Sequence, residues 1–205
     1  MTRSHWERVY GTKKPTEVSW YQATAEPSLS LIVKAVPDRS TPIIDVGGGA
    51  STLVDGLLSQ GYADVTVLDV SGAALEQAAA RLGESARRVT WIESDILACA
   101  LPSGRYGMWH DRAVFHFLTS ASERDSYVGK VRTSVRPGGH VMIATFARGG
   151  PLKCSGLDVV RYAPGELHQE FGVDFELLGC VDDEHHTPGG AVQPFIYCMC
   201  RASGR

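Results

Sequence analysis

A glycine-rich turn follows a short apolar run in the first quarter of the chain. The run at 41–46 leads into 47–51, which contains Gly47, Gly48 and Gly49. Glycine lets the backbone turn tightly and approach a ligand that a Cβ would hold away. Twenty residues after Gly49, Asp69 ends a β-branched run, where its carboxylate can accept hydrogen bonds from both hydroxyls of a ribose. Together they predict a nucleoside site; the alternative is an ordinary strand-to-helix turn beside a surface aspartate.

The turn lacks two features of phosphate-binding loops. Thr52 stands where the third glycine of GxGxxG would pack beside a pyrophosphate, and GxxxxGK[ST] is absent. This weakens a dinucleotide interpretation, and a nicotinamide reductase is kept only as a further alternative. Nucleosides without phosphate remain, above all S-adenosylmethionine.

Acid–base groups gather after a later apolar run, in His110-Asp111-Arg112 and at His116. The carboxyl ends of parallel strands form the ligand-binding edge of an open α/β sheet. Asp111 could position a sulfonium or a substrate donor there, and His116 could act as a general base. In the alternative, Asp111 pairs with Arg112 or caps the next helix, and His116 packs between two phenylalanines.

Four aromatic residues occur in an amino-terminal segment that is otherwise rich in polar residues: Trp6, Tyr10, Trp20 and Tyr21. They predict a lid over cofactor and substrate, with Tyr10 and Tyr21 touching the cofactor and Trp20 the substrate. They would equally anchor this segment to the sheet, and the two interpretations are compatible.

A third group of polar residues follows residue 150. Its members are Cys154, Arg161, Tyr162, His185, His186 and Gln193. We expect substrate contacts from Arg161, Tyr162 and His186. No metal is expected, because adjacent histidines in a turn point apart and no further ligand has a recognised spacing.

Composition limits the possible partners. The 205 residues carry 20 basic and 23 acidic side chains, for a formal charge of −3. There is no basic field to hold nucleic acid and no apolar run long enough to span a membrane, so neither partner is expected. Five scattered cysteines without CxxC favour reduced thiols in the cytoplasm, with Cys198 and Cys200 as packing residues on one strand face.

Alternating β-rich and helical runs must position these groups. Expected strands cover 41–46, 64–70, 88–92, 104–111 and 140–146, and expected helices cover 51–60, 71–82 (capped by Ser71) and 122–135, with Pro137-Gly138-Gly139 breaking the chain before the fifth strand. A short helix near 164–171 then precedes strands at 175–183 and 192–200, with a polar turn at 185–190. We therefore expect an α/β fold with a doubly wound, seven-stranded, mostly parallel sheet and an antiparallel C-terminal hairpin.

The ordered series IIDVGGGAS, VTVLDVS, WIESDI, LPSGRYGMWHDRAVFHFL and RPGGHVMIATF resembles the class I S-adenosylmethionine-dependent methyltransferases of small single-domain type. The resemblance spans about residues 40–147 and departs at Ser51, where many members carry glycine. It implies one Rossmann-like domain over 1–205, with a cap at 1–26, a cofactor-binding core at 40–147 and a substrate-side region with the hairpin at 148–205.

Site residues follow from the resemblance position by position. Asp45, Gly47 and Gly49, with Gly48 between them, would hold the methionine part of S-adenosylmethionine. Asp69 and Val70 would bind the ribose, and Asp95 and Ile96 would frame the adenine. His110, Asp111 and Arg112 would face the methyl group, Arg112 on the substrate side.

The sequence leaves the methyl acceptor open. A small molecule is favoured, because no recognition module is appended to the core. A protein-lysine methyltransferase is the alternative, since HWERVYGTKKPTEVSWYQ resembles the cap of some enzymes of that kind. A non-catalytic cofactor sensor is a third possibility.

Overall fold

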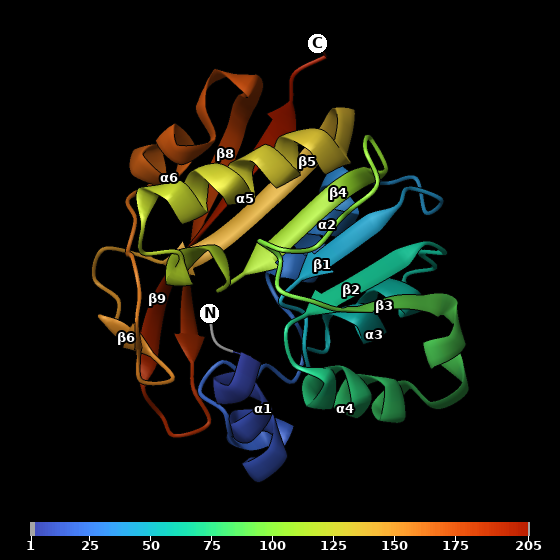
Figure 1. The fold of residues 1–205 in the computed structure, drawn as a ribbon, viewed down its shortest axis with the longest axis vertical. Coiled ribbons are helices and arrows are strands. Elements are labelled where there is room, and N and C mark those ends of the chain that lie inside the picture. Colours follow the sequence, from blue (N-terminus) through green and yellow to red (C-terminus); the bar gives the residue numbers. More distant parts are fainter. Residues whose placement is uncertain (1–2, 205) are drawn as a thin grey trace.

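Seven strands form the central sheet of the computed structural model, which describes residues 3–204 (Figure 1). The parallel strands are β1 (Ile43–Val46), β2 (Val65–Asp69), β3 (Val89–Glu93), β4 (Tyr106–Arg112) and β5 (Val135–Phe146), and the antiparallel pair is β8 (Phe175–His186) and β9 (Val192–Ala202). Their order across the sheet is β3-β2-β1-β4-β5-β9-β8. The predicted doubly wound fold with its C-terminal hairpin is confirmed.

Helices cover both faces of this sheet (Figure 1). One face packs against α2 (Ser28–Ala35), α3 (Leu53–Ser59) and part of α4 (Gly72–Leu82), and the other against α5 (Ala121–Ser134) and α6 (Pro164–Phe171). Consecutive strand residues point to opposite faces, so Ile43 joins the first core and Ile44 the second. As expected, Ser71 caps α4, its hydroxyl accepting from the Ala74 amide at 3.2 Å.

Short elements lie between the main ones. The 3₁₀ turns are η1 (Pro15–Glu17), η2 (Gly83–Arg88), η3 (Phe115–Phe117) and η4 (Gly172–Asp174). A small antiparallel pair, β6 (Lys153–Cys154) and β7 (Leu157–Asp158), follows the parallel strands. Helix α1 (Arg3–Thr12) lies beside α4 at the end of the sheet toward which β2 and β4 run (Figure 1).

Two strands begin or end beyond their expected bounds. β5 begins at Val135, which pairs with Tyr106 before an irregularity in register, so Pro137-Gly138-Gly139 lies within the strand instead of breaking the chain before it. β8 continues to His186, where His185 pairs with Gln193 and His186 with Val192. The two histidines therefore lie on a strand, which corrects the expected turn at 185–190.

The cysteines also depart from expectation. Cys180 and Cys198 lie directly opposite each other on β8 and β9 and form a disulfide, whereas Cys99, Cys154 and Cys200 are free and buried. The expectation that all five thiols are reduced is therefore wrong, and Cys198 is a cross-strand link instead of a simple packing residue. The reduced thiols were the argument for the cytoplasm, and disulfides are rare there. The cytoplasmic location therefore stays a prediction.

No helix among residues 3–204 is long and apolar enough to cross a membrane.

Candidate active site

Two adjoining cavities open at the carboxyl ends of β1, β2 and β4. The first is lined by Trp6, Tyr10, Trp20, Val46, Gly47, Leu68, Asp69, Val70, Ser94, Asp95, Ile96, Arg112, Ala113, Val114, Phe117 and Cys154. The second is lined by Tyr10, Pro15, Val18, Trp20, Tyr21, Gln22, Ala25, Ser28, Asp45, Gly47, Gly48, Ala50, Ser51, Thr52, Leu53, His110 and Arg112. The two cavities share four residues: Tyr10, Trp20, Gly47 and Arg112. They therefore meet beside the glycine turn and the end of β4.

The glycine turn approaches its neighbours too closely for a side chain. Gly47 has φ +69°, and a Cβ there would lie 2.0 Å from Val114 Cγ2. At Gly49, with φ +43°, a Cβ would lie 2.9 Å from Asp69 Oδ2 and 3.2 Å from the Tyr10 hydroxyl. The absence of side chains therefore lets the turn pack directly against Val114, Asp69 and Tyr10.

Asp69 ends β2 on the wall of the first cavity. Its Oδ1 accepts from the Ser71 amide at 2.8 Å, and Oδ2 faces Gly49. Burial, with a smaller contribution from the charge of Asp45, raises the pKa of Asp69 to about 7. Hydroxyl donors from a ribose would compensate this desolvated carboxylate, which makes Asp69 a suitable ribose acceptor.

The segment after β3 forms the adjacent wall. Asp95 Oδ1 accepts from the Leu97 amide at 2.8 Å, and the Ser94 amide donates to the Asp69 carbonyl at 2.9 Å. Asp95 and Ile96 thus present a carboxylate and an apolar side chain to one cavity, as an adenine ring requires.

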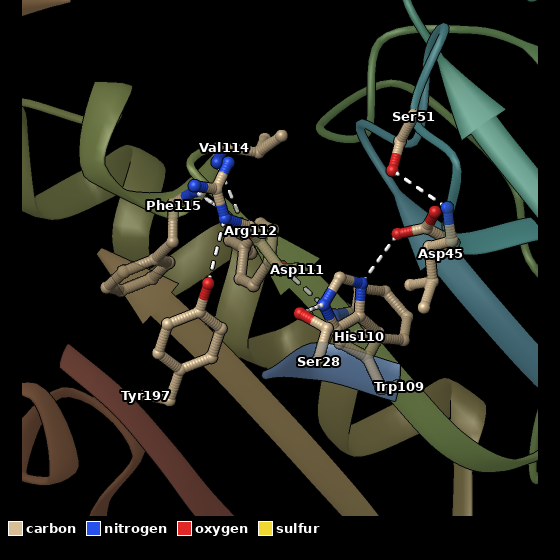
Figure 2. Close-up of polar contacts among 12 residues, drawn as sticks. Ser28, Asp45, Ser51, Trp109, His110, Asp111, Arg112, Val114, Phe115 and Tyr197 are labelled. Atoms are coloured by element: carbon tan, nitrogen blue, oxygen red, sulfur yellow. Dashed lines mark hydrogen bonds and ion pairs between the residues drawn. The ribbon is translucent and has the colours of Figure 1, made fainter. Parts of the chain in front are cut away.

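His110 joins β4 to the glycine turn and to α2 (Figure 2). Its Nδ1 lies 2.6 Å from Asp45 Oδ1, and its Nε2 lies 2.9 Å from Ser28 Oγ. The imidazole thus bridges a carboxylate oxygen on β1 and a serine hydroxyl on α2. Both nitrogens are occupied, which suits His110 to positioning Asp45.

Asp111 points away from the cavities. Its carboxylate accepts from the Val114 amide at 2.9 Å, from the Phe115 amide at 3.1 Å and from the Tyr127 hydroxyl. Burial raises its pKa to about 6. These contacts correspond to the capping alternative, since Asp111 holds the turn that follows β4.

His116 lies on η3, outside both cavities. Its ring packs against Phe117 and Phe146, and neither ring nitrogen has a hydrogen-bond partner in the described structure. Burial, and then the charge of Arg112, lower its pKa to about 3. A neutral imidazole in these surroundings is poorly placed to take a proton from a ligand.

The amino-terminal aromatics meet over the first cavity. Trp20 Nε1 donates to the Tyr10 hydroxyl at 3.0 Å, and the Trp6 and Trp20 rings meet edge to face at 5.6 Å. His5 Nε2 lies 3.1 Å from Ser155 Oγ, which ties α1 to the β6–β7 turn. Tyr21 lines only the second cavity and an open pocket beyond it.

The remaining expected substrate residues lie elsewhere. Arg161 Nη1 donates to the carbonyls of Arg148 and Gly150, and Arg161 and Tyr162 line a separate open pocket. His186 lies on the open pocket between β8 and the amino-terminal segment. The structure does not bring these three residues to the two cavities.

Several lining residues escaped sequence reasoning. Ser28 belongs to no motif; its only signal is its place before the apolar run of α2. Cys154, a member of the third polar group with no role assigned from the sequence, lines the first cavity, where burial raises its pKa to about 11. Ser94 follows β3 and could have been included with Asp95. No group of three metal-ligating side chains occurs among residues 3–204.

Comparison with known proteins finds one family match in the sequence. Residues 43–139 match the family model described as a methyltransferase domain. No curated protein matches the chain in sequence.

Solved structures share the fold. An S-adenosylmethionine-dependent methyltransferase from Anabaena variabilis has a TM-score of 0.74 and 18% identity, covering 98% of this chain and 94% of its own. The 1,6-didemethyltoxoflavin N1-methyltransferase of Burkholderia thailandensis, with bound S-adenosylhomocysteine, has the same score and identity and covers 98% and 87%. A putative methyltransferase of Haloferax volcanii, in complex with its activator Trm112, has a TM-score of 0.78 at 13% identity and covers 100% and 99%.

The matched domain spans a little under half of the chain, and the solved methyltransferases share its fold and strand order.

Proposed function

We propose that this protein is a class I S-adenosylmethionine-dependent methyltransferase and that it acts on a small molecule. The observation that carries the proposal is the cover over the first cavity. Trp6 and Tyr10 of α1, Trp20 and Cys154 of β6 all line it, and the His5–Ser155 contact holds α1 to β6–β7. Such a cover suits a compact acceptor better than the surface of a folded protein.

In this proposal the cofactor lies along the strand ends. Asp69 accepts from the ribose, Asp95 and Ile96 hold the adenine, and the backbone of Gly47 to Gly49 faces the methionine part. His110 keeps Asp45 oriented beneath the turn. The bound cofactor would supply a methyl group attached to a positively charged sulfonium. After transfer of the methyl group, the sulfur would remain as a neutral thioether.

The chain's own contribution is then mainly orientation and exclusion of water. A neutral leaving group needs no acid, and holding nucleophile and methyl carbon in line gives most of the acceleration. Asp111 and His110 are engaged in internal hydrogen bonds, and His116 lies outside the cavities. We therefore assign no general base among these residues.

A protein substrate is the second candidate, favoured by one feature. An open pocket between β8 and the amino-terminal segment is bordered by Glu26, Asp183 and Glu184, and it shares Tyr21 and Gln22 with the second cavity. An acidic approach of this kind would suit a lysine side chain.

Methyl transfer to cell extract separates the two candidates. The protein is incubated with extract and S-adenosylmethionine labelled on its methyl group, and small molecules are then separated from protein by ultrafiltration. We expect label in the filtrate. Label confined to the protein fraction would reject the small-molecule proposal in favour of the second candidate. A matched incubation with Asp69→Asn provides the control for label that does not depend on the cofactor site.

A further inference from the structure

Arg112 is a partly buried cation whose donors are only partly used. At the end of β4, its Nε donates to the Tyr197 hydroxyl at 2.9 Å, and its Nη1 donates to the Trp20 carbonyl at 3.4 Å. Its Nη2 is buried and has no hydrogen-bond partner in the described part of the chain. An unpaired buried donor on a charged group is costly, so a missing acceptor is expected at this position.

No carboxylate of the described residues neutralises this guanidinium. The ion pairs found within residues 3–204 join other arginines, Lys153 and His110 to carboxylates, and none includes Arg112. Two carboxylates of the site bind other groups. Asp111 accepts hydrogen bonds from the Val114 and Phe115 amides, and Asp45 is paired with His110. The positive charge is therefore available to a ligand.

Neighbouring side chains hold the guanidinium rigidly. Its Cζ lies 4.3 Å above the centre of the Phe195 ring, and Tyr197, on the same strand, fixes Nε from the side (Figure 2). A guanidinium fixed in this way loses little freedom when it binds an anion, and its planar fork matches the two oxygens of a carboxylate.

The position of Arg112 links this charge to the methyl-transfer site. Arg112 and Gly47 each line both cavities, so the guanidinium lies where the cofactor cavity meets the second one. A sulfonium brought in by the cofactor adds a second positive charge to this region. The guanidinium and the sulfonium together would attract an anionic methyl acceptor into this water-poor pocket.

We propose that the methyl acceptor is a small anion, carrying a carboxylate or a comparable oxyanion, and that Arg112 binds that group. Arg112 thereby selects the substrate by charge. This inference rests on the proposed function, since it names the class of acceptor used by the same site.

The test compares three probes of one shape and different charge: benzoate, benzamide and benzamidinium. Each is titrated by calorimetry into protein saturated with S-adenosylhomocysteine, for wild type, Arg112→Met and Arg112→Lys. Arg105→Met is the matched control, because Arg105 precedes the opposite end of β4 and its half-exposed side chain pairs with Asp64 at 2.8 Å. Circular dichroism and the unfolding midpoint establish that each variant is folded.

We expect wild type and Arg105→Met to bind benzoate at least about tenfold more tightly than the other two probes, as a charge-assisted pair would give. Arg112→Met should lose this preference while its affinity for S-adenosylhomocysteine changes by less than about threefold. Arg112→Lys should retain part of the preference, since it keeps the charge and loses the fork.

Three results would overturn the inference, and each has a different meaning. Equal binding of the three probes by wild type would show that the site does not select anions, a result that needs no variant to fold. A loss of S-adenosylhomocysteine affinity in Arg112→Met as large as the loss for benzoate would assign the guanidinium to the cofactor's own carboxylate. Failure of wild type to bind S-adenosylhomocysteine would reject the proposed function itself.

Discussion

The proposed cofactor side and the proposed acceptor side of this site are built in different ways. On the cofactor side, Gly47 and Asp95 follow two parallel strands and Asp69 ends the strand between them, so three short segments meet at one sheet edge. On the acceptor side, Trp20 and Arg112 meet Cys154 and Tyr197, which come from four distant parts of the chain. The first arrangement follows directly from strand order, whereas the second depends on how the amino-terminal segment and the C-terminal hairpin pack.

The largest effect is expected from Gly47→Ala on the cofactor side. The added Cβ would lie 2.0 Å from Val114 Cγ2, at a φ of +69° that disfavours any side chain. Steric overlap and backbone strain should together cost about 2–4 kcal/mol of stability and abolish cofactor binding. Urea unfolding and calorimetry with S-adenosylhomocysteine measure the two effects.

Gly61→Ala is the matched control for this substitution. Gly61 has φ +87°, but a Cβ added there would meet nothing within 4 Å, so only the backbone cost of about 1 kcal/mol applies. Equal losses in the two variants would contradict the role of close approach at Gly47.

Asp69→Asn should weaken S-adenosylhomocysteine binding by about 1–3 kcal/mol, because a charged acceptor of the ribose hydroxyls is replaced by a neutral amide. Calorimetry measures the change. Asp64→Asn, just before the opposite end of β2, alters the surface pair with Arg105 and should leave the affinity unchanged. An unchanged affinity in Asp69→Asn would remove the ribose assignment.

Cofactor affinity should also depend on pH through Asp69. Its pKa is raised to about 7, so the carboxyl is largely protonated below that pH and must lose its proton to accept both hydroxyls. Affinity should therefore rise between pH 6 and pH 8, by up to about tenfold per unit at the acid end. Titrations in buffers of different ionisation enthalpy should show proton release at pH 6.5, and Asp69→Asn should show none.

The smallest effect on binding is expected from His116→Leu, because His116 lies outside both cavities. Its effect should appear in acid. The folded pKa is lowered to about 3, so the unfolded chain takes up a proton below pH 6.5 while the folded chain does not, and wild type loses stability as pH falls. The variant should escape this loss of up to about 1.4 kcal/mol per pH unit. Urea unfolding at pH 7 and pH 5 tests it, and a large drop in turnover at neutral pH would restore the role of general base.

Sequence patterns predicted the parts of the molecule that local chemistry determines. The alternation of apolar runs gave the strands and the hairpin, and the glycine turn with Asp69 indicated the cofactor edge. Contacts across the chain carry no such pattern: His5 meets Ser155, His185 meets the Ser19 carbonyl, and Cys180 meets Cys198 only because the strands pair in that register. The place of Ser28 beside His110 likewise depends on tertiary packing of α2.

The edge-to-face pair of Trp6 and Trp20 gives the protein an internal optical probe. The chain has four tryptophans, and these two line the first cavity, whereas Trp91 and Trp109 belong to the packing around the sheet. A ligand that enters the cavity lined by these two indoles should change their emission, so occupancy can be followed in real time, without a label and before any acceptor has been identified.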